Sequence, residues 1–177
     1  GTFSVALPRR FPDVECVCVD AAPEMTAITR ARLAAHAPLF ADRARFVVQR
    51  FETLGFAPGA FDLIASSISL HHVHDKGALY RALHELLRDG GHLVFADQMR
   101  GASERVHAIN WERWLAFCRE PSHCTKEEIA SLLAHAEAHD HYTPVREHFA
   151  LMEGAGFREV DCVWRDGSWG IIVASRA

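Results

Sequence analysis

The chain has 177 residues, of which 49% are hydrophobic and 24% are charged, and its formal net charge is -4 at pH 7. This size and composition predict one globular domain over residues 1–177 with a hydrophobic core. The slightly acidic balance argues against a nucleic-acid surface, and no apolar run is long enough to cross a membrane. Five scattered cysteines do not form a disulfide framework, so we expect a cytoplasmic protein.

The first part of the chain alternates between helical and strand patterns. A short helix is expected over residues 2–10. Pro23 and Glu24 open a second helix, to about His36, because proline suits the first helical turn and glutamate suits the positive end of the helix dipole. Runs of β-branched and apolar residues predict strands. These strands are residues 14–19, 45–49 and 61–66.

Asp75 opens a further helix, in which Leu79, Leu83 and Leu86 share one apolar face. The sequence Asp-Gly-Gly at 89–91 is expected to end this helix, and residues 92–97 form a fourth strand. This alternation of strands and helices predicts a mostly parallel sheet covered by helices.

After Gln98 the pattern becomes almost entirely helical, and we expect a helical cover over approximately residues 101–156. Thr125 followed by Glu128 is a capping-box signature. The spacing of Trp111, Trp114 and Phe117 indicates core packing under a helix, or an aromatic wall for a ligand. Two strands, 159–164 and 169–174, follow, and Asp166-Gly167 between them predicts an antiparallel hairpin.

Polar side chains follow the predicted strands at the points where the strands end. The stretch FDLIASSISLHHVH (61–74) passes from a strand, expected to be buried, to two serines and three histidines, and Asp20 closes the first strand. Ligands of open α/β sheets bind beyond the carboxyl ends of the strands. Asp20 is therefore expected to accept hydrogen bonds from the two ribose hydroxyls of a nucleoside, or else to cap the following helix.

Four segments together make the chain resemble the class I S-adenosylmethionine-dependent methyltransferases, in their small-molecule branch. These segments are VDAAPEM (19–25), FETLGFAPGAFDLIASSISLHHV (51–73), ALYRALHELLRDGGHLVFADQ (78–98) and EGAGFREVDCVW (153–164). The resemblance implies an α/β, Rossmann-like doubly wound sheet with a C-terminal antiparallel hairpin. It implies transfer of a methyl group from S-adenosylmethionine to oxygen or nitrogen of a small-molecule acceptor, with S-adenosylhomocysteine as the product.

The resemblance also implies roles for individual residues. Asp20 would hold the ribose, and His72 would act as the base that takes the acceptor's proton, or as the residue that orients the acceptor. His71 would lie beside His72 and near the cofactor. The residues assigned to cofactor binding are Gly1, Asp20, Ala21, Met25, Phe51, Glu52, Ser66, Ser67 and His71.

Two features depart from the family pattern. The family begins with a strand and a glycine-rich loop, whereas this chain starts at Gly1-Thr2-Phe3, which resembles the end of that loop. We therefore expect the central strand to lie upstream or to come from another segment. Arg50 occupies the position where the family often has an acidic residue for the adenine amino group, and Glu52 would substitute for it.

Other interpretations of these residues remain open. A metal cluster of His71, His72 and His74 is a minor alternative, because only Asp75 adds a carboxylate nearby in sequence, and no metal is expected. His135 and His139 lack the residue order of a zinc-protease motif and fit a solvated helix face. At the level of the whole chain, an NAD(P)-dependent Rossmann oxidoreductase and a non-catalytic S-adenosylmethionine-binding relative are the competing classes. A monomer or homodimer is expected.

Overall fold

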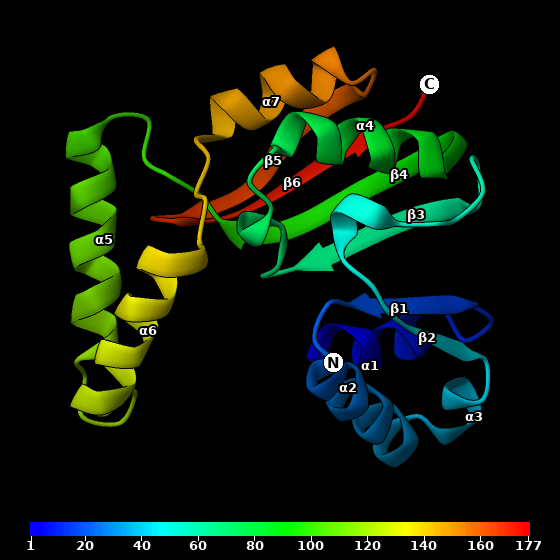
Figure 1. Cartoon of the computed structure of the whole chain (residues 1–177), viewed down its shortest axis with the longest axis horizontal. Helices are drawn as coiled ribbons and strands as arrows, with labels where there is room; N and C mark the ends of the chain where they lie inside the picture. Colours follow the sequence, from blue (N-terminus) through cyan, green and yellow to red (C-terminus); the bar gives the residue numbers. More distant parts are fainter. The chain divides into compact units, whose positions relative to one another are not determined.

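The computed structural model describes all residues 1–177, which divide into two compact units, residues 1–55 and residues 56–177. Each unit has its own sheet (Figure 1). The sequence predicts one mostly parallel sheet, and the structure instead has a two-stranded and a four-stranded sheet, because β1 and β2 pair only with each other. The elements of the first unit are α1 (Thr2–Arg10), β1 (Cys16–Asp20), α2 (Pro23–His36), α3 (Pro38–Ala41), β2 (Ala44–Val48) and the 3₁₀ helix η1 (Phe51–Thr53).

In the first unit, β1 and β2 are parallel and α2 packs against both. The predicted helices over 2–10 and from Pro23 to His36 are confirmed with these bounds. Thr26, Thr29 and Leu33 are the buried residues of α2, and their spacing places them along one face of the helix. Leu33 is fully buried and Phe40 of α3 nearly so, and the two supply the apolar centre of this unit.

The second unit contains the longer sheet, in the order β3-β4-β6-β5. The strand β4 pairs in parallel with β3 and antiparallel with β6, and β6 pairs antiparallel with β5. The predicted C-terminal hairpin is thereby confirmed, and Gly167 in its turn has a φ of 57°. The elements are β3 (Phe61–Ser67), the 3₁₀ helix η2 (Leu70–His72), α4 (Lys76–Leu86), β4 (Leu87–Gln98), α5 (Glu104–Cys118), α6 (Lys126–His139), α7 (Val145–Gly154), β5 (Arg158–Asp166) and β6 (Trp169–Ser175).

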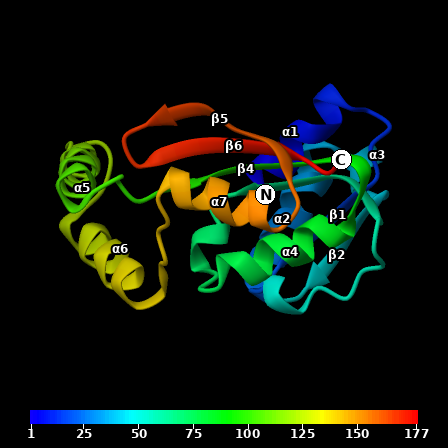
Figure 2. The ribbon, with the colours of Figure 1, turned by 90° about the horizontal axis from the view of Figure 1, so that it is seen from above.

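The helices α4 and α7 lie side by side on one face of this sheet (Figures 1 and 2). Burial alternates along the end of β4, where Leu93, Phe95 and Asp97 are buried. Since alternate residues of a strand point to the same face, Asp97 points to the same side as the core residues Leu93 and Phe95. A carboxylate is thus built into the buried face where β4 ends.

Two predictions about this sheet are wrong. The Asp-Gly-Gly sequence at 89–91 does not end α4, because β4 already begins at Leu87 and Gly90 bonds through its backbone to Arg176. The strand β3 is not fully buried, and 42% of Leu63 is exposed. The reason is that β3 is an edge strand of this sheet and has one neighbour.

The segment expected to form a helical cover contains the helices α5 and α6, which lie beyond the ends of β3 and β4 (Figures 1 and 2), and the helix α7. Thr125 and Glu128 form the predicted capping box at the start of α6. Trp111 and Trp114 contact each other, but Phe117 is 60% exposed and stacks on His123, so its prediction as a core residue is wrong. No helix of the chain combines the length and apolar character needed to cross a membrane.

Candidate functional site

In the first unit, the residues predicted to bind a cofactor gather where β1 and β2 end. Asp20 is the last residue of β1, and η1 follows β2 with Phe51 and Glu52. The backbone N–H of Gln49 donates to the carbonyl of Asp20, which joins the two strand ends at 3.0 Å. Gly1 packs against α2, where a Cβ would lie 3.0 Å from Cα of Thr29.

The Asp20 carboxylate is part of the turn into α2. Its Oδ1 accepts a hydrogen bond from the backbone N–H of Ala22 at 2.9 Å, and Ala22 is the N-cap residue of α2. Asp20 is therefore a turn residue before α2 and does not cap this helix, which has no side-chain cap hydrogen bond. Because this bond uses one lone pair of Oδ1, the carboxylate retains acceptor capacity for a ligand.

Three other predicted residues of this edge are accessible. Met25, in the first turn of α2, is 44% exposed, and Ala21 is also exposed. Glu52 forms an ion pair with Arg50, with 3.3 Å between Oε1 and Nη2. The Arg50 side chain is thus the neighbour of Glu52, the residue expected to substitute for the family's usual acid. Both side chains are exposed, so this pair stabilises the fold little.

In the second unit, the predicted site residues lie where β3 and β4 end. Ser66 and Ser67 are the last residues of β3, opposite Phe95 and Ala96 of β4. The Ser66 and Ser69 hydroxyls are 2.6 Å apart and hydrogen-bonded. Between them, Ile68 has a φ of 55°, which is an uncommon conformation for a β-branched residue. This turn redirects the chain from β3 into η2, which carries both histidines.

His71 is held by the carboxylate that ends the buried face of β4. Its Nδ1 is 2.5 Å from Oδ1 of Asp97, and its backbone N–H donates to Oδ2 of the same residue at 3.0 Å. Both side chains are buried. Asp97 therefore fixes the position of His71 through two contacts, one to the backbone and one to the ring.

Asp140, which follows α6, joins the two histidines of η2. Its Oδ1 is 3.0 Å from Nδ1 of His72 and 3.6 Å from Nε2 of His71. Its Oδ2 accepts a hydrogen bond from the Tyr142 hydroxyl at 2.5 Å. His135 of α6 is also near, with Nε2 at 3.9 Å from Oδ1. Burial lowers the pKa of His72, and the neighbouring His71 lowers it further.

A buried lysine connects the two backbone segments that carry this group. Lys76 Nζ donates to the carbonyls of Val73, His71 and His141, the last at 3.0 Å. The backbone N–H of His141 donates to the carbonyl of His71 at 2.8 Å. Burial lowers the pKa of Lys76, and the charge of Asp97 partly opposes that effect. The loop with η2 and the segment after α6 are thus fastened together.

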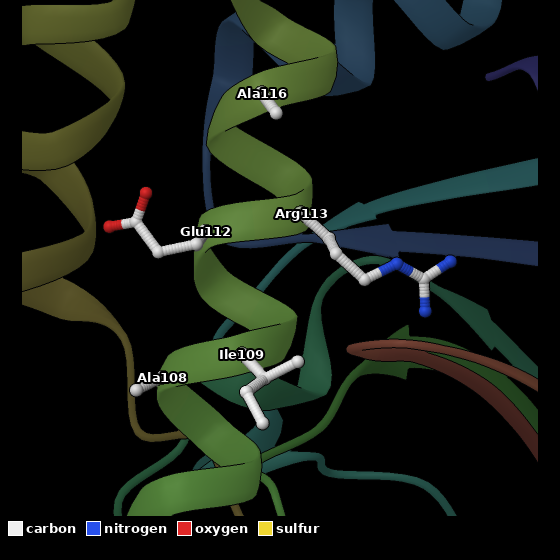
Figure 3. A pocket seen from close by; sticks show the side chains of 5 residues that line it. All are labelled: Ala108, Ile109, Glu112, Arg113 and Ala116. Carbon is white, nitrogen blue, oxygen red and sulfur yellow. The ribbon is translucent and has the colours of Figure 1, made fainter.

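Two hollows involve the helical cover. One, of about 580 Å³, lies between α5 and α6 and includes Trp111, Leu133, Asp140 and Tyr142 in its lining. The other lies on α5 alone (Figure 3), where Glu112 and Arg113 point to opposite sides of the helix. Its lining includes two alanines and no group of converging polar side chains, so it offers no chemistry. The hollow that adjoins Asp140 is the relevant one.

Sequence reasoning located His71, His72 and the strand ends, but it missed Asp140, Tyr142 and Lys76. Asp140 lies 68 positions beyond His72, and the contact arises from the packing of the helical cover. A signal was present in the run His-Asp-His-Tyr at 139–142, which concentrates titratable side chains between two helices. The 3₁₀ helix η2 brings His71 and His72 together, with 4.0 Å between their ring centroids.

The fold and the polar groups at its strand ends define an α/β protein of the Rossmann-like methyltransferase type. Residues 1–91 match the model of a family described as "Methyltransferase domain", which covers half of the chain. The chain belongs to this methyltransferase-domain family.

Solved structures of similar fold include SibL, an S-adenosylmethionine-dependent methyltransferase in its apo form. It matches 98% of this chain and 46% of its own, with 16% identity and a TM-score of 0.69. Geranyl diphosphate C-methyltransferase from Streptomyces coelicolor A3(2), solved with Mg²⁺, geranyl diphosphate and S-adenosyl-L-homocysteine, matches 100% of this chain and 68% of its own, with 18% identity and a TM-score of 0.69. These likenesses establish the fold.

Among curated proteins, the uncharacterised YafE of Escherichia coli (strain K12) is 39% identical over 72 residues, which is 41% of this chain and 34% of YafE. The chain therefore spans about a third of that relative. It likewise spans between 46% and 52% of three of the similar solved structures.

Proposed function

We propose that this protein transfers a methyl group from S-adenosylmethionine to oxygen or nitrogen of a small-molecule acceptor and releases S-adenosylhomocysteine. The observation that carries the proposal is the methyltransferase-family match over residues 1–91, a segment in which Asp20 stands at the end of β1. Support comes also from structures of the same fold that contain S-adenosylhomocysteine, namely PigF and geranyl diphosphate C-methyltransferase. The second of these methylates carbon, so the acceptor atom is a part of the proposal that experiment must decide.

Methyl transfer requires mainly that the reacting atoms are aligned. The sulfonium of S-adenosylmethionine already provides a good leaving group, so the protein has to hold the acceptor atom, the methyl carbon and the sulfur in line. Such positioning can contribute about 7 to 11 kcal/mol to lowering the barrier. A site that binds both partners rigidly at the ends of strands serves this purpose.

The cofactor assignments follow the resemblance. Asp20 would accept hydrogen bonds from the ribose hydroxyls, with Ala21 and Met25 beside the adenine. The remaining residues proposed for the cofactor are Gly1, Phe51, Glu52, Ser66, Ser67 and His71. Each of these lies at or next to the end of a strand in its own unit, except Gly1, which packs against α2.

The acceptor is proposed to bind in the hollow between α5 and α6, where Trp111 and Tyr142 provide aromatic surface. Their ring centroids are 6.1 Å apart. His72, whose side chain is 43% exposed, is proposed as the catalytic residue that contacts and orients the reacting group of the acceptor. The net charge of -4 supports a small molecule rather than a nucleic acid as the acceptor. The five free cysteines support a reducing compartment such as the cytoplasm.

Calorimetric titration with S-adenosylhomocysteine tests the cofactor assignment. Wild-type protein should bind it, and Asp20→Ala should weaken binding at least about tenfold, because a hydrogen bond to a charged group contributes roughly 1.5 to 3 kcal/mol. Asp13→Ala, which removes an exposed carboxylate before β1, is the matched control and should bind like the wild type.

The same titration with NAD separates the competing classes. Binding of NAD and not of S-adenosylhomocysteine would identify a Rossmann oxidoreductase and overturn the proposal. Binding of S-adenosylhomocysteine without methyl transfer to any member of a broad acceptor panel would support a non-catalytic relative. Failure to bind either ligand would also contradict the proposal.

A further inference from the structure

The cluster around Asp140 has the composition and spacing of a metal-binding group. Each of His71, His72 and Asp140 offers one ligand atom within 4.8 Å of the other two, and Oδ1 of Asp140 lies 3.6 Å from Nε2 of His71 and 3.0 Å from Nδ1 of His72. Ligand atoms that bind zinc tetrahedrally at about 2.0 to 2.1 Å are about 3.3 Å from one another. This value lies between the two distances from Oδ1 of Asp140 to the histidine nitrogens. We propose that His71, His72 and Asp140 bind a divalent transition-metal ion of the zinc type.

The first argument is the state of the Asp140 carboxylate. Its side chain is 6% exposed, and Oδ1 has no hydrogen-bond partner although histidine nitrogens from two elements surround it. Oδ2, in contrast, is satisfied by the Tyr142 hydroxyl. A buried oxygen without a partner is costly, and a charged one more so. A cation beside Oδ1 removes this cost.

The second argument is the orientation of His71. In the neutral imidazole, the contact of Nδ1 with the Asp97 carboxylate favours the tautomer with the proton on Nδ1, in which Nε2 presents a lone pair. That lone pair faces Oδ1 of Asp140 at 3.6 Å, which places two electron-rich atoms opposite each other. Metal-binding histidines commonly have this arrangement, in which a carboxylate holds the far ring nitrogen and the near nitrogen binds the ion.

The third argument is charge. Asp97 and Asp140 are both buried, and the only buried lysine of the cluster, Lys76, donates to backbone carbonyls instead of to either carboxylate. Two buried carboxylates need compensation, and a doubly charged ion supplies it. Lys76 instead holds together the two backbone segments that carry the ligands, so the cluster is preorganised.

The types of ligand atom indicate which metal ions the cluster would bind. Two imidazole nitrogens and one carboxylate oxygen suit zinc and related transition metals, whereas Mg²⁺ prefers oxygen ligands alone. Three protein ligands leave one tetrahedral position for water or another oxygen ligand, and His135, with Nε2 at 3.9 Å from Oδ1, lies beside the group. The inference uses residues of the second unit alone and does not depend on methyl transfer.

Metal binding to the chelator-stripped protein tests this inference. Calorimetry with ZnCl₂ should give one site per chain, and CoCl₂ should produce the visible absorption bands of a low-coordinate Co²⁺ complex with nitrogen and oxygen ligands. Asp140→Asn should weaken zinc binding at least about tenfold, and Asp97→Asn, which alters the support of His71, should weaken it about 10-fold to 100-fold. His74→Ala is the matched control, since His74 is exposed and contacts His141 outside the cluster.

The result that overturns the inference is the absence of stoichiometric zinc binding to the wild type. Unchanged affinity in Asp140→Asn overturns it as well, because exposed histidines would then account for the binding. Should Asp140→Asn fail to fold, His72→Ala replaces it, since the His72 side chain is partly exposed and its removal leaves the buried groups in place. The same tenfold criterion then applies to His72→Ala.

Discussion

Each buried polar residue at the end of the longer sheet makes a different set of contacts. Asp97 holds His71 through two contacts, Asp140 joins His71 to His72, and Lys76 fastens the backbone of both segments. These groups come from β4, from η2, from the start of α4 and from the segment after α6. Because they are buried and contact one another, a single replacement leaves a buried partner without its contact and should lower stability as well as disturb the site.

At this scale, His72 offers the most direct test of the proposed reaction. His72→Ala should lower kcat at least about tenfold, because an acceptor that is no longer oriented reaches the in-line geometry less often. Affinity for S-adenosylhomocysteine should change little. The measurement is methyl transfer from labelled S-adenosylmethionine to an acceptor found by screening, with His74→Ala as the control. Equal loss of kcat and of cofactor affinity would count against a role of His72 toward the acceptor.

Among the elements, α6 depends strongly on its own local interactions. None of its residues is buried, so tertiary packing stabilises it little, and the capping box of Thr125 and Glu128 stands at its first turn. The helix also leads directly into Asp140. A helix of this kind is expected to open locally at a lower free energy than the sheet.

The capping box therefore determines how often α6 opens. Thr125→Ala should destabilise this helix by about 1 kcal/mol, which corresponds to roughly fivefold faster amide exchange in α6. Amides of β4 and β6 should keep the wild-type rates. Hydrogen exchange followed by mass spectrometry measures both. Ser131→Ala, at an exposed position within α6, is the control, and equally faster exchange in the sheet would contradict local opening.

The elements that could be predicted are those determined by residues close together in the sequence. The helix opened by Pro23, the capping box at Thr125 and the hairpin at Gly167 are confirmed, because each rests on residues adjacent in sequence. The end of α4 was predicted wrongly, since the pairing of β3 with β4 draws the segment after Leu86 into the sheet. Long-range pairing overrides a local glycine signal.

The same distinction applies to the candidate site. The positions of Asp20 and Ser66 at strand ends could be predicted, because the order of strands and helices shows where each parallel strand ends. Asp140 was not predicted, because its place beside His72 depends on how α6 and the following segment pack. The exposure of Phe117 has a similar origin, since helical spacing indicates a face but not what covers that face.

Across the whole molecule, the histidines link stability to pH. The chain has twelve of them, and histidine is the side chain whose ordinary pKa lies in the range between pH 5 and 8. His148 is different, because it is buried against Tyr80 and Phe95 and its Nδ1 is 2.5 Å from the Tyr80 hydroxyl. Burial lowers the pKa of His148 to about 4, and the charge of Lys76 acts in the same direction.

The sign of the pH effect follows from this lowered pKa. Above pH 6.5, the ordinary histidine pKa, His148 is neutral in both states and has no effect on the pH dependence. Between pH 6.5 and about 4 the unfolded chain binds the proton and the folded chain does not, so stability falls as the pH falls. Below pH 4 both states are protonated and this loss levels off, at about 3 kcal/mol in total.

Urea unfolding at a series of pH values from 7.5 to about 4 measures this dependence as the slope of the unfolding free energy against pH. His148→Gln should flatten the slope between pH 6.5 and 4, whatever its effect on stability at pH 7.5. Tyr80→Phe removes the hydrogen bond but keeps the buried imidazole, so its slope should remain steep. His92→Gln, at an exposed position of β4, should follow the wild type. If His148→Gln loses stability with falling pH as steeply as the wild type, the acid sensitivity arises elsewhere, and the buried imidazole is not its cause.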